Sequence, residues 1–145
     1  MNKAVRLEPI AEYAGMVETE AARRLAASAK ALETKQHDVE KLRSYLAEYR
    51  QRADLEQSST ASLRWRNTRA FLARLTDIVA VQEAELVKAV ERYRLETERW
   101  RESYRRSKSL DIVIEQAQRE LLQEHQKRDQ AELDELIMQR TLQRR

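Results

Sequence analysis

Apolar residues return at every seventh position through two long stretches of the chain, which a short polar segment separates. Before this segment, the positions that share the spacing are Leu25, Leu32, Val39, Leu46 and Ala53. After it, they are Leu72, Val79, Leu86, Tyr93 and Trp100, followed past a gap at Ser107 by Ile114 and Leu121. An apolar repeat of this kind, sustained over several heptads, is typical of coiled-coil helices. The pattern therefore predicts two such helices.

The first helix is expected over about residues 9–56. Pro9 fits the first helical turn, because the N–H that proline lacks would have no partner there. Gly15 costs a helix about 1 kcal/mol, so the first turns are expected to be weak. Ile10 and Val17 extend the apolar series toward the N-terminus. Since the step from Val17 to Leu25 is eight residues, we expect the apolar stripe to shift there.

Residues 57–62 (Gln-Ser-Ser-Thr-Ala-Ser) are the polar break and predict a turn. The second helix is expected over about residues 63–140, followed by a frayed basic tail at 141–145. At 1.5 Å per residue the two helices would be about 70 Å and 115 Å long, so the second would extend past the first from about residue 112. The predicted fold is all-α, a single domain of 145 residues in which two long helices form an antiparallel coiled-coil hairpin with the second helix longer.

Six apolar residues are placed symmetrically about residue 60, three on each side of the break: Leu42, Tyr45, Tyr49, Phe71, Leu75 and Ile78. An antiparallel hairpin would lay them side by side. Tyr45, Phe71 and Ile78 lie one position off the heptad series, so they widen the apolar stripe beyond what two helices can bury. Exposed apolar width on a slender protein favours a partner-binding surface. Structural packing is the alternative.

The composition supports long helices. The chain is 37% charged and contains one Gly and one Pro, so it has few of the residues that turns require. Disorder is the competing interpretation of so much charge, but the charge here is of mixed sign and the apolar residues are periodic. There is no Cys, which excludes disulfides and thiolate metal sites. No apolar run approaches the roughly 20 residues of a membrane span, and no signal peptide is evident, so a soluble cytoplasmic protein is expected.

The net charge is +3, and the basic excess lies after the break. Two basic clusters stand out there: Arg64, Arg66, Arg69 and Arg74, and then Arg99, Arg101, Arg105, Arg106 and Lys108. Such clusters are compatible with solvated helix faces carrying ion pairs between successive turns. The alternative is docking onto acidic protein surfaces. Binding to nucleic acid is not expected.

The sequence offers no catalytic chemistry. A phosphate-binding loop needs several glycines, and this chain has one. His37 and His125 fall on different predicted helices and far apart in the hairpin, so they cannot share a metal ion. No pair of carboxylates stands out among so many helical ones. The protein is therefore expected not to be an enzyme and to bind no cofactor. Trp65 is expected either to cover the turn or to contact a partner, and Trp100 to pack in the seam.

Several short segments, spread over nearly the whole chain, carry a family resemblance: Ala21-Ala22-Arg23, Tyr45 with Glu48-Tyr49-Arg50, Arg64-Trp65, Phe71 with Leu75, Trp100-Arg101-Glu102 and, more loosely, the run from Asp129 to Leu136. In these segments, in its length and in the position of its break, the sequence resembles FliJ, the small coiled-coil protein of the flagellar type III export apparatus.

The resemblance implies a coiled coil similar to the central stalk of rotary ATPases. Such a protein would promote assembly of the export ATPase ring (FliI-like), link it to the export gate protein (FlhA-like) and assist export chaperones. It would be cytoplasmic, peripheral to the inner face of the cell membrane at the flagellar base without inserting into it, and a monomer in isolation.

The family's gate-binding surface matches the symmetric residues Leu42, Tyr45, Tyr49, Phe71 and Leu75, while Ile78 and Gln82 stand at its remaining places with changed side chains. Asp38 differs from the uncharged polar residue usual there and is not assigned. The basic end at Arg140, Arg144 and Arg145 is the candidate contact for the ATPase ring.

Three alternatives remain open from the sequence. One is the equivalent stalk of a virulence type III secretion system, and another is a scaffolding coiled coil with no ATPase partner. The third concerns assembly, because two chains can exchange helices in place of pairing them within one chain.

Overall fold

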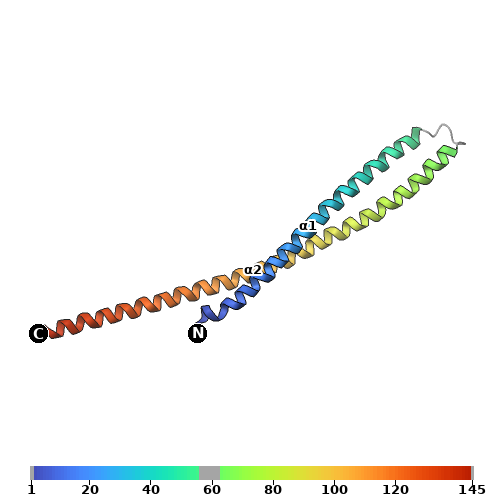
Figure 1. The fold of residues 1–145 in the computed structure, drawn as a ribbon. Helices are drawn as coiled ribbons and strands as arrows, with labels where there is room; N and C mark the ends of the chain where they lie inside the picture. The colour runs from blue at the N-terminus through green and yellow to red at the C-terminus, as the bar shows by residue number, and fades with distance from the viewer. Residues whose placement is uncertain (1, 56–62, 145) are drawn as a thin grey trace. The chain divides into compact units, whose positions relative to one another are not determined.

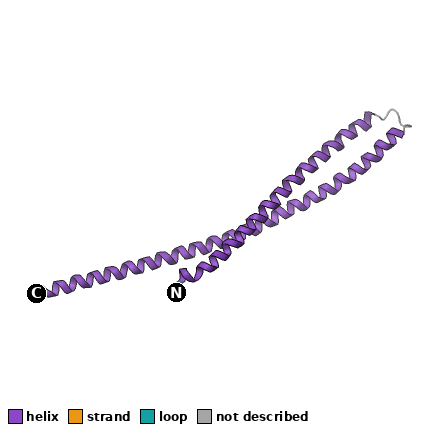
Figure 2. Cartoon of the chain, viewed as in Figure 1, coloured by secondary structure: helices purple, strands orange, loops and turns teal. Residues whose placement is uncertain are grey.

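The computed structural model describes residues 2–55 and 63–144. These residues form two helices, α1 (Lys3–Leu55) and α2 (Leu63–Gln143), and no strand occurs in the described ranges (Figure 2). Helix α2, with 81 residues, is longer than α1, with 53. The predicted all-α fold with a longer second helix is therefore confirmed. The turn expected at 57–62 lies outside the described residues.

Helix α1 begins six residues earlier than predicted, at Lys3. Asn2 caps it, since its side-chain Oδ1 accepts a hydrogen bond from the Val5 N–H at 2.8 Å and its carbonyl accepts one from the Arg6 N–H at 3.2 Å. Asparagine is among the strongest N-cap residues. Pro9 consequently lies inside the helix rather than in its first turn.

Helix α2 begins at Leu63, as predicted, and ends at Gln143, three residues beyond the expected end. The Arg144 N–H donates to the Arg140 carbonyl at 3.2 Å and closes the last turn. The described part of the tail that was expected to fray from residue 141 is helical to Gln143. Residue 145 lies outside the described residues.

The chain divides into two compact units. The middle unit is Glu20–Trp100, and the terminal unit combines Met1–Thr19 with Arg101–Arg145. Each unit contains a part of both helices.

In the middle unit the two helices run antiparallel and pack against each other (Figure 1). Three contacts between them fix the direction. Lys35 Nζ donates to Gln82 Oε1 at 2.8 Å, Arg43 Nε donates to Glu83 Oε1 at 2.9 Å, and the Tyr49 and Phe71 rings lie 4.8 Å apart. From the Lys35–Gln82 contact to the Tyr49–Phe71 contact, residue numbers rise along α1 and fall along α2, which confirms the antiparallel hairpin.

The core of the middle unit follows the predicted heptads. Leu46, Leu75 and Val79 form its buried cluster, with Leu42, Tyr49 and Leu72 packed around them, and Val39 is completely buried nearby. One seam position departs from the prediction, since Tyr93 remains 38% exposed. The next seam position, Glu96, is buried instead: its Oε1 accepts a hydrogen bond from Arg99 at 3.2 Å, and its Oε2 has no hydrogen-bond partner among the described residues.

In the terminal unit the seam of α1 is carried by small residues. Ala4 and Ala14 are buried and Ala11 is half-buried, whereas Ile10 and Val17 are 50% and 41% exposed. The expectation that Ile10 and Val17 begin the seam is therefore wrong. The half-buried positions Glu18 and Ala11 lie seven and fourteen residues before Leu25, so the heptad register of α1 does not shift.

The distal part of α2 has no partner helix within the described chain. Positions 113, 114, 117 and 121 are still half-buried, and every described residue from 122 to 144 is exposed. Full exposure thus begins about ten residues later than predicted, because α1 starts at Lys3 and reaches farther along α2. A search of the described helices finds none that is both long and apolar enough to cross a membrane.

Candidate partner-binding surface

The seven residues singled out as a binding surface all lie in the middle unit, and they separate by exposure. Leu75 is buried, and Leu42, Tyr49 and Gln82 are half-buried. Tyr45, Phe71 and Ile78, the three residues that lie off the heptad series, are 54%, 44% and 49% exposed. The surface is therefore an exposed apolar layer that rests on the helix-helix core.

The less exposed members hold the hairpin together. Leu42 and Leu75 pack in the core with Leu46 and Val79. The side-chain oxygen of Gln82 accepts the cross-helix hydrogen bond from Lys35, and this contact is partly buried. These residues position the exposed ones and offer a partner little surface of their own.

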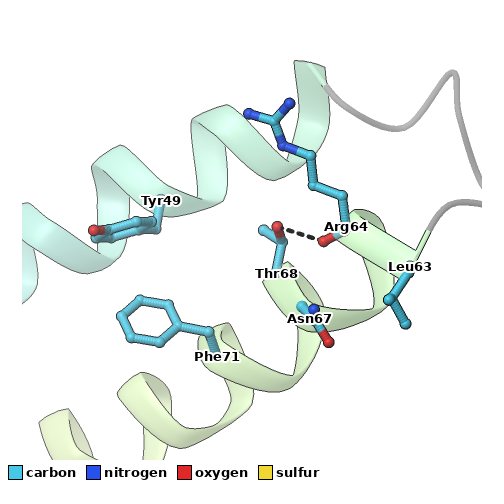
Figure 3. A pocket seen from close by; sticks show the side chains of 6 residues that line it. All are labelled: Tyr49, Leu63, Arg64, Asn67, Thr68 and Phe71. Carbon is cyan, nitrogen blue, oxygen red and sulfur yellow. Dashed lines mark hydrogen bonds between the residues drawn. The ribbon is translucent and has the colours of Figure 1, made fainter.

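Two aromatic side chains join the helices at one end of this surface. Tyr49 on α1 and Phe71 on α2 point toward each other with an angle of 62° between their rings, an edge-to-face contact (Figure 3). Such contacts contribute about 1 kcal/mol beyond the area that they bury. The Arg52 guanidinium lies over the Tyr49 ring, 5.3 Å from its centre. The aromatic pair therefore has a fixed geometry and a basic neighbour.

A groove of about 520 Å³ opens beside this aromatic pair. Among the described residues it is lined by Tyr49, Leu63, Arg64, Asn67, Thr68 and Phe71 (Figure 3). The Thr68 hydroxyl donates to the Arg64 carbonyl at 2.9 Å, so its polar atom is engaged within α2. Leu63, Asn67 and Thr68 were not expected to belong to a site. Their spacing from Phe71 at multiples of three and four is the signal that places them on its side of the helix.

A second, smaller groove lies in the terminal unit. It is lined by the exposed side of α1 and by two residues of α2: Ile10, Tyr13, Ala14, Val17, Ser103 and Arg106. The apolar residues that were expected in the seam thus form the wall of a groove.

The charge of the arginines is balanced differently in different parts of the two helices. On α1, Glu20 binds Arg23 at 2.6 Å and Arg24 at 3.3 Å, and the hydrogen bond from Arg23 lowers the pKa of the Glu20 carboxyl from 4.5 to about 2. This is a solvated ion pair within one helix. Around the aromatic pair basic residues are in excess: residues 43–55 and 63–74 contain seven arginines against Glu48 and Asp54, although Arg43 pairs with Glu83 and Arg52 with Glu48. That end of the middle unit therefore favours acidic partners.

The two tryptophans have local partners. Trp65 is half-buried, and the Arg69 guanidinium lies 4.9 Å from the centre of its ring. The turn that Trp65 was expected to cover lies outside the described residues. Trp100 is half-buried at its seam position, as expected.

The candidate ring contacts lie on the exposed distal part of α2. Arg140 and Arg144 are exposed, and Arg145 is outside the described residues. Five large apolar residues of the same segment are more than half exposed: Leu133, Leu136, Ile137, Met138 and Leu142. In the described part of the chain, no group of three or more histidine or acidic residues is arranged to hold a metal ion.

Comparison with known protein families identifies the family of this chain. The chain matches the model of the family described as flagellar FliJ protein over residues 2–145. Comparisons with curated proteins and with solved structures return no match. The family match covers nearly the whole sequence and agrees with the helical hairpin, so this chain belongs to the flagellar FliJ protein family and is a component of the flagellar export apparatus.

Proposed function

We propose that the protein is a non-enzymatic adaptor that links the export ATPase ring to the export gate protein. In this proposal the gate protein binds the exposed layer of Tyr45, Phe71 and Ile78, and Leu42, Leu75 and Gln82 keep the two helices in register beneath it. The observation that supports the proposal is the large exposed fraction of these three apolar side chains beside a well-packed core. Apolar side chains that a monomer leaves exposed together commonly mark a protein interface.

The distal part of α2 is the proposed contact for the ATPase ring. Its exposed apolar residues and the arginines at its end have no partner helix in the described chain. A segment that binds several ring subunits at once favours the assembled ring, because binding to one state shifts the equilibrium toward it. We include in the same proposal the handling of export chaperones and a peripheral position at the inner face of the cell membrane, and membership of the export apparatus supports both.

The gate contact is tested with the double variant Tyr45→Ala/Phe71→Ala. We expect it to weaken binding to the purified cytoplasmic domain of the gate protein by more than about tenfold, as the loss of two central aromatic residues does at many interfaces. Helicity, measured by circular dichroism, should be retained. An unchanged affinity in a protein that remains helical would contradict the assignment of this surface.

The ring contact is tested with Leu136→Asp/Ile137→Asp in the exposed segment of α2. We expect weaker stimulation of hexamer formation and of ATP hydrolysis by the purified export ATPase, with gate binding unchanged. Glu135→Ala, in the same turn, is the matched control. A chain that binds neither the ATPase nor the gate protein would instead be a scaffolding coiled coil.

A further inference from the structure

The exposed residues of the candidate surface continue along one side of α2 toward its first turn. Positions spaced by three or four residues share one side of a helix. Six residues of α2 follow this spacing: Leu63, Asn67, Phe71, Arg74, Ile78 and Val81. The four apolar ones are between 44% and 73% exposed. The surface therefore extends beyond the residues that the family resemblance implied, to Val81 at one end and to Leu63 at the other.

Helix α1 supplies the opposite wall at the Leu63 end. Tyr45, Tyr49 and Arg52 are spaced by four and three residues, so they too share one side of their helix. Tyr49 meets Phe71 edge to face, and Arg52 lies over the Tyr49 ring. The groove lined by Leu63, Asn67 and Phe71 thus shares Phe71 with the exposed surface, and Figure 3 shows Tyr49 and Phe71 beside it.

The chemistry of the groove limits what it accommodates. Its walls are mainly apolar and aromatic, and its volume of about 520 Å³ is sufficient for a large side chain. Asn67 adds an amide with two donors and one acceptor at the wall. Arg64 lines the groove, and Arg74 follows Phe71 on the same side of α2. Even with Arg43 paired to Glu83 and Arg52 to Glu48, arginines outnumber acidic residues in ranges 43–55 and 63–74, so this end of the hairpin attracts negative charge.

We propose that this groove is an anchor pocket for a bulky apolar side chain carried on an acidic segment of the gate protein, whose carboxylates meet Arg64 and Arg74. This inference rests on the proposed gate contact and adds to it a site with its own lining residues, Leu63 and Asn67. A large aromatic or aliphatic side chain that loses its water at the centre of an interface is a common hot spot, because the contacts around it exclude solvent.

The experiment measures binding of the full chain to the purified cytoplasmic domain of the gate protein. Asn67→Trp places a ring in the groove, and Ala73→Trp places the same ring on another side of α2, where residue 73 is exposed. Arg74→Glu reverses a charge on the groove side, and Arg66→Glu reverses one on another side of the same helix. Tyr45→Ala reports on the exposed surface without touching the groove. Circular dichroism confirms that each variant is helical.

We expect Asn67→Trp and Arg74→Glu each to weaken binding by about tenfold, and the controls Ala73→Trp and Arg66→Glu to change it by less than about threefold near physiological salt, where screening limits distant charges. If Tyr45→Ala weakens binding while Asn67→Trp does not, the anchor pocket is wrong and the gate contact stands. If neither variant weakens binding, or the unmodified chain does not bind, both proposals are overturned. If Arg74→Glu and Arg66→Glu weaken binding equally, the acidic segment does not face the groove.

Discussion

Gly15 is a single residue that limits the stability of a helix. It lies inside α1, and a Cβ built on it meets no heavy atom within 4 Å. Glycine costs a helix interior about 1 kcal/mol relative to alanine, chiefly through the freedom of the unfolded chain. We therefore expect Gly15→Ala to raise the free energy of unfolding by about 1 kcal/mol in urea titrations followed by circular dichroism. A lower free energy of unfolding for Gly15→Ala would contradict this and would show that the added methyl group disturbs the packing around residue 15.

Glu96 is a second residue that affects stability. Its carboxylate is buried in the seam, and one of its oxygens lacks a hydrogen-bond partner among the described residues. A buried polar atom left unsatisfied costs about 1–3 kcal/mol. We expect Glu96→Leu to raise the free energy of unfolding by about 1 kcal/mol or more, since leucine suits a seam position. Glu98→Leu, at an exposed position of the same turn, is the control and should change stability much less.

At the scale of the helices, the seam provides most of the stability of the middle unit. Val39 is fully buried, whereas Val87 is 63% exposed. Removing two methyl groups from a packed site costs about 2 kcal/mol, and removing them from the surface costs less than about 0.5 kcal/mol. Val39→Ala should therefore lower the urea midpoint clearly and Val87→Ala should leave it nearly unchanged. Equal effects would indicate that the helices do not pair in this register.

The two helices also show which parts of the fold can be predicted from the sequence and which cannot. Heptads of large residues such as Leu46 and Val79 are visible in the sequence, and they led directly to the two helices and their antiparallel pairing. The predicted start of α1 at Pro9 was wrong because the helix begins at Lys3, after the Asn2 cap, and Pro9 lies inside it. The seam of the terminal unit was misplaced because alanines carry it, and hydrophobic patterns weight alanine weakly.

The candidate surface was only partly predictable for a related reason. The offset of Tyr45, Phe71 and Ile78 from the heptads is a property of the sequence and pointed to their exposure. The spacing of Leu63 and Asn67 from Phe71 places them on one side of α2, but the groove itself depends on how Tyr49 and Phe71 meet across two helices, which the pattern of one helix does not contain.

At the scale of the whole molecule, the account assigns two partners to separate parts of one chain. The gate protein would bind the side of the middle unit that carries Ile78, and the ATPase ring would bind the exposed end of α2. Because the two contacts share no residues, variants of one should leave the other intact. A mixture of chain, ATPase and gate domain should therefore form a ternary complex, and competition between the two partners would contradict the adaptor role.

The central claim is that the gate protein binds the side of the hairpin that carries Ile78. A photoreactive amino acid placed at Ile78 in flagellated cells tests this directly, with the same group at Ala73, on another side of α2, as the matched control. The account predicts that crosslinks to the gate protein form from position 78 and not from position 73. Crosslinks to the gate protein from position 73 alone, in a chain that still supports motility, would contradict it.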